Sequence, residues 1–88
     1  MIAAVQLGHE IVGVLRGARR PLDANEVFER LPLPRKIEGA SGTGESVTAI
    51  ELELRRLERA GLVEHGPGFA TGNDGKARFL GAPTWRLP

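Results

Sequence analysis

The side chains in this chain best suited to catalysis or metal binding are its two histidines, His9 and His65. One falls in a predicted helix and the other in a predicted strand, and no carboxylates at metal-ligand spacing accompany them. The chain has no cysteine, which excludes disulfides and thiolate metal sites. Neither histidine has a serine beside it arranged as a nucleophile. The sequence therefore predicts no catalytic residue, no metal site, no cofactor and no enzyme activity.

A glycine-rich segment, Gly39 to Ser46, has nearly the spacing of a phosphate-binding P-loop. Glu45 occupies the position of the essential lysine, and the preceding residues, PLPRKIE, do not have the pattern of a buried strand. We therefore interpret the segment as a flexible connector within a proline- and glycine-rich loop over 32–44. A loop of this length is either functional or an insertion, and the sequence leaves both open.

The net charge of +1 does not by itself favour nucleic acid as a partner, because phosphate contacts usually require an excess of basic residues. The local distribution of lysine and arginine is therefore what matters. Three basic clusters stand out: Arg55, Arg56 and Arg59 on a predicted helix, Lys76 and Arg78 beside a predicted turn, and Arg35 and Lys36 in the loop. Such clusters can be solvated faces with salt bridges, phosphate-binding surfaces or protein-binding surfaces.

Helical spacing of apolar residues predicts the elements that position these clusters. The first helix is expected at about 2–16, with an apolar face near Val5, Val12 and Leu15 that is widened by Leu7, Ile11 and Val14. A short second helix is expected at about 24–31, with Asp23 as its N-cap in a capping box with Glu26.

The third helix has the strongest signal. Its apolar stripe consists of Val47, Ile50, Leu54 and Leu57, its cap is Ser46 or Thr43, and Gly61 ends it. Strands are expected at 62–65, 77–80 and 84–87, with a hairpin turn at Asn73-Asp74-Gly75 and a single strand rung at Leu22. Trp85 is expected in the core.

These elements predict an α+β fold, mostly helical, formed by residues 1–88 as one domain. No apolar run approaches the length of about 20 residues that spans a bilayer, and the N-terminal residues lack the basic start of a signal peptide. A cytoplasmic protein without membrane contact is the expectation.

In this order of elements the chain resembles the winged-helix family, or winged helix-turn-helix, of small bacterial DNA-binding regulators. The resemblance is carried by Arg20-Pro21-Leu22-Asp23, by the run from Leu54 to Glu64 (LRRLERAGLVE) and by Trp85-Arg86-Leu87. It implies three helices closed by a C-terminal β-hairpin wing. It also implies double-stranded DNA as the partner, with the third helix in the major groove and the wing at an adjacent groove. The residues implied in DNA binding are Ser46, Thr48, Arg55, Arg56, Lys76, Arg78, Arg35 and Lys36.

Two features of the third helix also favour a different partner. Glu45, Glu51 and Glu53 crowd the start of the helix, where carboxylates repel phosphates. Leu52 lies about 200° around the helix from Ile50, so it is expected on the exposed face. The alternative function is therefore a protein-interaction or assembly module that uses Ala49 and Leu52 to bind a protein partner or to form a homodimer.

Overall fold

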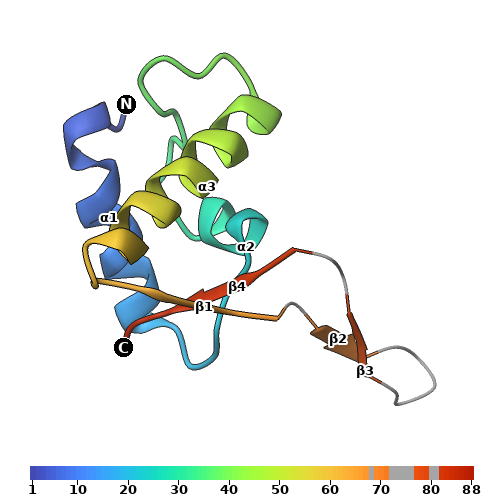
Figure 1. The fold of residues 1–88 in the computed structure, drawn as a ribbon. Coiled ribbons are helices and arrows are strands. Elements are labelled where there is room, and N and C mark those ends of the chain that lie inside the picture. Colours follow the sequence, from blue (N-terminus) through green and yellow to red (C-terminus); the bar gives the residue numbers. More distant parts are fainter. Residues whose placement is uncertain (68, 72–76, 80–81) are drawn as a thin grey trace.

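The structure is a computed structural model that describes residues 1–67, 69–71, 77–79 and 82–88, with only the backbone described at 69–71 and 77–79. Within these residues, three helices precede four short strands (Figure 1). The elements are α1 (Ala4–Gly17), α2 (Ala24–Glu29), α3 (Thr43–Arg59), β1 (Glu64–Gly66), β2 (Phe69–Thr71), β3 (Ala77–Phe79) and β4 (Thr84–Arg86). The predicted α+β class is confirmed. The predicted turn at Asn73-Asp74-Gly75 lies outside the described residues.

The start of α2 has the capping box that the sequence predicts. The Asp23 carboxylate accepts a hydrogen bond from the Glu26 amide at 2.8 Å, and the Glu26 carboxylate accepts one from the Asp23 amide at 3.2 Å. The helix ends at Glu29, earlier than predicted, with Arg30 as its C-cap. Pro32 and Pro34 follow, and the residue before a proline is disfavoured in helical conformation.

The N-terminus of α3 differs from the prediction. Its N-cap is Gly42, which has no side chain to cap the helix, and Thr43 is the first helical residue. Ser46 therefore lies inside the first turn rather than at the cap.

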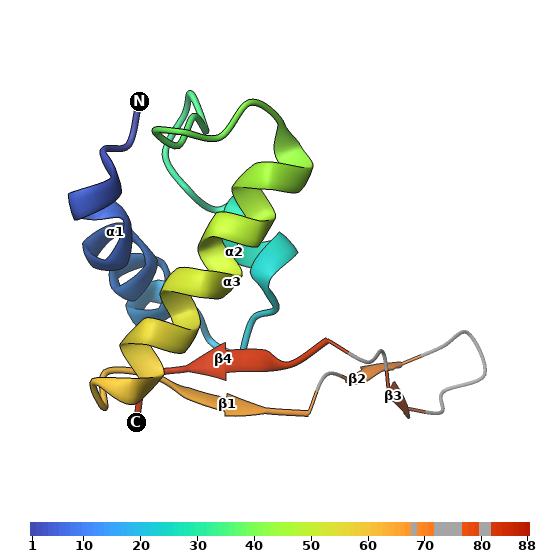
Figure 2. The same ribbon diagram turned by 45° about the horizontal axis from the view of Figure 1, so that its top comes forward.

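The strands form a hairpin with a third segment beside it. β1 pairs with β4 in antiparallel register, with His65 opposite Trp85. β2, which follows β1, pairs with β3, which precedes β4, also in antiparallel register. Leu22 forms an isolated antiparallel bridge with Trp85, which confirms the predicted single rung. Figure 2 shows β2 and β3 beyond the end of β1 and β4 that lies away from the helices.

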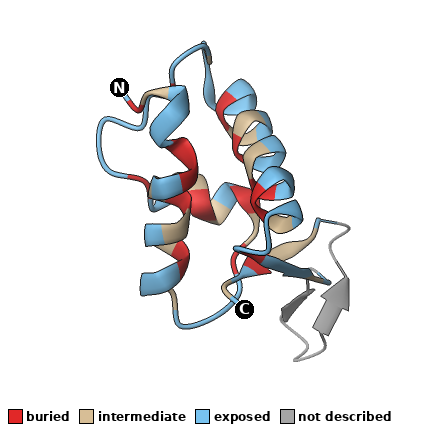
Figure 3. Ribbon diagram, turned by 60° about the vertical axis from the view of Figure 1, so that its left-hand side comes forward, coloured by how far each residue is buried: buried red, intermediate tan, exposed pale blue. Residues whose placement is uncertain are grey.

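The core lies between the three helices and the inner end of the hairpin (Figure 3). From the predicted α3 stripe, Ile50, Leu54 and Leu57 are buried, and Trp85 is buried as predicted. Val5, predicted on the apolar face of the first helix, is instead 92% exposed. The stripe of α1 that faces the core is formed by Leu7, Ile11 and Leu15, together with Gly8.

The loop before α3 is tied to the chain's N-terminal residues, an anchor that no sequence pattern predicts. Ile2 forms a parallel bridge with Ile37, the Ile2 amide donates to the Lys36 carbonyl at 2.7 Å, and the Glu38 amide donates to the Ile2 carbonyl at 2.9 Å. Both isoleucines are buried. The middle of the predicted loop over 32–44 is thus fixed against the domain, just before the glycine-rich segment. No helix among the described residues has the length and apolar character needed to cross a membrane.

Candidate nucleic-acid interface

The outer face of α3 carries four exposed side chains at helical spacing: Thr48, Leu52, Arg55 and Arg59. They lie on the side opposite the buried residues of the same helix. At 1.5 Å per residue, this face extends about 16 Å along the helix axis. Leu52 is 65% exposed in the middle of it, as predicted. Two hydrogen-bonding cations, an apolar group and a hydroxyl therefore face solvent on one helix.

The two outer arginines are available to an external anion. Within the described part of the chain, neither Arg55 nor Arg59 forms an ion pair. Arg56 differs from them, because its Nε donates to the Glu53 carboxylate at 2.7 Å and its Nη2 pairs with the same group. That hydrogen bond raises the pKa of the Arg56 guanidinium.

Arg56 is directed toward α1 rather than toward the outer face. A Cβ atom placed on Gly8 of α1 would lie 3.2 Å from Arg56 Nη2 and 2.8 Å from Glu53 Oε1. The Glu53–Arg56 pair is thus packed where α1 approaches α3. This placement does not favour the prediction that Arg56 contacts DNA. Arg59, rather than Arg56, lies beside Arg55 on the outer face of α3.

Ser46 and Ala49 do not lie where the sequence analysis placed them. Ser46 is only 4% exposed, because it precedes the buried Ile50 by one helical turn and shares its face. The predicted place of Ser46 on the exposed, groove-facing side is therefore wrong, and this burial does not favour the prediction that it contacts DNA. Ala49 is half-buried and packs against the core. Of the two predicted protein-interface residues, Leu52 is the exposed one.

Two of the three carboxylates at the start of α3 are engaged within the protein. The Glu45 carboxylate accepts a hydrogen bond from the Ser41 amide at 2.8 Å, which holds the pKa of Glu45 below its ordinary value. Glu53 is neutralised by Arg56. Glu51 is exposed and remains a negative charge beside the outer face. The Thr48 hydroxyl donates to the Gly44 carbonyl at 3.0 Å and keeps its lone pairs for another partner.

The predicted basic residues of the hairpin are described only in part. Lys76 lies outside the described residues, and Arg78 lies in β3 opposite Ala70, with its side chain not described. On the inner pair of strands, Arg86 forms an ion pair with Glu64 at 3.1 Å across the register.

A contact that sequence reasoning missed joins α3 to the hairpin. His65 Nδ1 on β1 pairs with the Glu58 carboxylate near the end of α3. The His65 ring also lies 5.6 Å from the Trp85 ring, tilted by 54°. The histidine thus contributes to the position of β1 relative to α3. Glu58 and His65 belong to different elements and are seven residues apart, so no local sequence pattern indicates that they pair.

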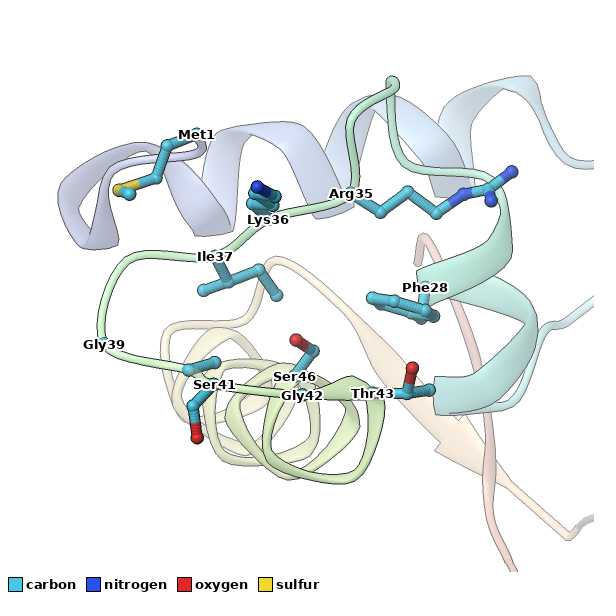
Figure 4. Close-up of a pocket in the computed structure, with 11 residues that line it drawn as sticks. Met1, Phe28, Arg35, Lys36, Ile37, Gly39, Ser41, Gly42, Thr43 and Ser46 are labelled. Atoms are coloured by element: carbon cyan, nitrogen blue, oxygen red, sulfur yellow. The ribbon is translucent and has the colours of Figure 1, made fainter.

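The loop residues Arg35 and Lys36 are exposed and line a pocket of about 520 Å³ at the N-terminal end of α3 (Figure 4). The same pocket is lined by the first turn of α3, including Thr43 and Ser46. These two basic residues are therefore associated with the beginning of the helix, whereas Arg55 and Arg59 lie toward its end.

Among the residues that the structure describes, no group of three or more histidine, aspartate or glutamate side chains is placed to hold a metal ion. No protein-family model matches this chain. No curated protein is similar to it in sequence at a significant level. The support for a nucleic-acid interface therefore comes from the geometry and charge of the residues described above.

Proposed function

We propose that this chain is a winged helix-turn-helix domain that binds double-stranded DNA. In this proposal the outer face of α3 enters the major groove and the hairpin continues as a wing along an adjacent groove. The order of three helices and a hairpin supports the proposal, as does the Leu22 rung that adds a third segment to the sheet.

The observation that carries the proposal is the pair of exposed arginines on α3, Arg55 and Arg59, which have no ion-pair partner in the described part of the chain. Arginine is the side chain that most often recognises guanine edges, and it also binds phosphate bidentately. Leu52, about one turn before Arg55 on the same face, offers an apolar contact of the kind that thymine methyl groups accept.

The direct test is selection from a pool of random-sequence DNA duplexes at about 50 mM salt, where phosphate contacts are strongest. Enrichment of a common sequence supports the proposal, because phosphate contacts alone carry no sequence information. Absence of any duplex binding at this salt concentration would reject it.

Leu52 favours a second candidate function, a protein-interaction or assembly module. A leucine with 65% of its surface exposed in the middle of a helix face is a suitable anchor for a partner or a second copy. Sedimentation of the parent chain and of Leu52→Glu separates the two functions. Self-association that the substitution abolishes supports assembly, whereas a monomeric parent argues against a homodimer.

A further inference from the structure

The pocket at the start of α3 is lined by Ser46, a buried residue whose hydroxyl has no hydrogen-bond partner among the described residues. Ser46 is 4% exposed, and among the described residues no donor or acceptor forms a hydrogen bond with its side chain. Its oxygen points into the pocket, between Ile37 and the first turn of α3 (Figure 4). Since the rest of the residue is buried, the hydroxyl is reached from the pocket, and a ligand atom there can be its hydrogen-bond partner.

The first turn of α3 adds unsatisfied donors to this pocket. The N-cap is Gly42, which offers no side chain to the backbone amides. No described residue accepts a hydrogen bond from the Thr43 or Gly44 amide. Such amides and the positive end of the helix dipole together favour an anion. With seventeen residues, α3 is long enough for that dipole to be developed.

The charge and the apolar surface of the lining specify the ligand further. Arg35 and Lys36 line the pocket, and neither forms an ion pair in the described part of the chain. The Glu45 carboxylate is held by the Ser41 amide and does not line the pocket. Phe28 and Ile37 supply an apolar wall. The volume of about 520 Å³ lies within the range of small-molecule sites.

We propose that this pocket binds a small organic carboxylate with an apolar group. The carboxylate accepts hydrogen bonds from the Ser46 hydroxyl and the first-turn amides of α3, with Lys36 and Arg35 of the lining as long-range counter-charges. The Arg35 guanidinium extends past Phe28, away from Ser46, so Lys36 is the nearer of the two (Figure 4). The apolar group packs against Phe28 and Ile37. This site is separate from the outer face of α3, so it does not depend on the proposed DNA binding.

Benzoate is a suitable probe, because it combines a carboxylate with one apolar ring. A ¹⁵N–¹H NMR titration of the full chain follows the amide resonances of residues 42–46. We expect saturable shifts with benzoate, much weaker shifts with benzamide, and much weaker shifts with inorganic phosphate. Equal affinity for benzamide would overturn the role of charge, and equal affinity for phosphate would overturn the role of the apolar wall.

Ser46→Ala tests the role of the Ser46 hydroxyl. We expect the Kd for benzoate to rise about tenfold, because hydrogen bonds to charged groups are among the stronger ones. The free variant should melt at or above the parent temperature, because it loses an unpartnered hydroxyl and gains helix propensity. An unchanged Kd in a folded variant would contradict the proposal.

Arg35→Gln and Lys36→Gln test the counter-charges, and each should raise the Kd about threefold, since exposed charges are screened by solvent. Arg16→Gln, an exposed arginine on α1 that does not line the pocket, is the matched control and should leave the Kd unchanged. An equal effect of Arg16→Gln and Arg35→Gln would indicate attraction by net charge alone and would overturn the site.

Discussion

Leu22 and Trp85 are joined by two backbone hydrogen bonds, from the Leu22 amide to the Trp85 carbonyl at 3.0 Å and from the Trp85 amide to the Leu22 carbonyl at 2.7 Å. Both side chains are buried. The segment between α1 and α2 is thereby fixed to the base of the hairpin. The position of the hairpin relative to α3 depends on this bridge together with the Glu58–His65 pair.

Leu22→Ala should lower the free energy of unfolding by about 3 kcal/mol, since truncating a fully buried leucine leaves a cavity. Urea denaturation followed by circular dichroism measures the change. Leu33→Ala is the matched control, because Leu33 is 76% exposed, and it should change stability by less than about 0.5 kcal/mol. Equal losses in the two variants would contradict the described burial.

Two glycines of α1 should respond differently to alanine. A Cβ atom added at Gly13 would have no neighbour within 4 Å, so Gly13→Ala should stabilise the chain by about 0.5–1 kcal/mol through helix propensity. At Gly8 the added Cβ would displace the Glu53–Arg56 pair and press on Leu57 Cδ2 at 3.3 Å. Gly8→Ala should therefore give little or no gain in the same denaturation assay. A gain as large as that of Gly13→Ala would argue against the close approach of α1 and α3.

The Arg20–Glu26 pair should make stability sensitive to acid. The hydrogen bond from Arg20 is the largest cause that holds the pKa of Glu26 below its ordinary value. A depressed folded-state pKa contributes stability above the unfolded-state pKa, near 4.5, and that contribution is lost as the pH falls through the folded-state pKa.

Comparing the pH dependence of the melting temperature of the parent with that of Glu26→Gln tests this assignment. The substitution removes the titrating group but retains a side chain that can accept the Asp23 amide. We expect the variant to be less stable than the parent at neutral pH and the difference to shrink below about pH 4.5. A difference that stays constant across this range would mean that Glu26 does not contribute the predicted acid sensitivity.

Local patterns in the sequence predict those parts of the fold that depend on neighbouring residues. The capping box of Asp23 and Glu26, the Leu22 rung and the burial of Trp85 are all confirmed. Each has a short-range signature: a cap spacing, an isolated apolar residue between helices, or an apolar position in a terminal strand.

The parts that the sequence does not predict depend on contacts between distant segments or on the residue at which a helix starts. The Ile2–Ile37 bridge joins the chain's first residues to a loop and has no local pattern. The sequence predicts Ser46 at the helix N-cap or on the groove-facing side, but α3 begins at Thr43, so Ser46 is a helical residue. It lies one turn before Ile50 and shares the buried face of that residue. The first residue of a helix is among the features that sequence patterns fix least, and here it separates a predicted cap residue from a buried helical one.

In the proposed function, Arg55 and Arg59 contact DNA phosphates or bases from the outer face of α3. The most direct measurement is the salt dependence of duplex affinity for the parent, for the double variant Arg55→Ala/Arg59→Ala and for Arg16→Ala, between about 50 and 200 mM salt. We expect the double variant to bind more weakly and to reduce the slope of log K against log salt by about two, roughly one for each lost phosphate contact. Arg16→Ala should retain the parent slope. A double variant with the same affinity and slope as the Arg16→Ala control would contradict this role of the two arginines.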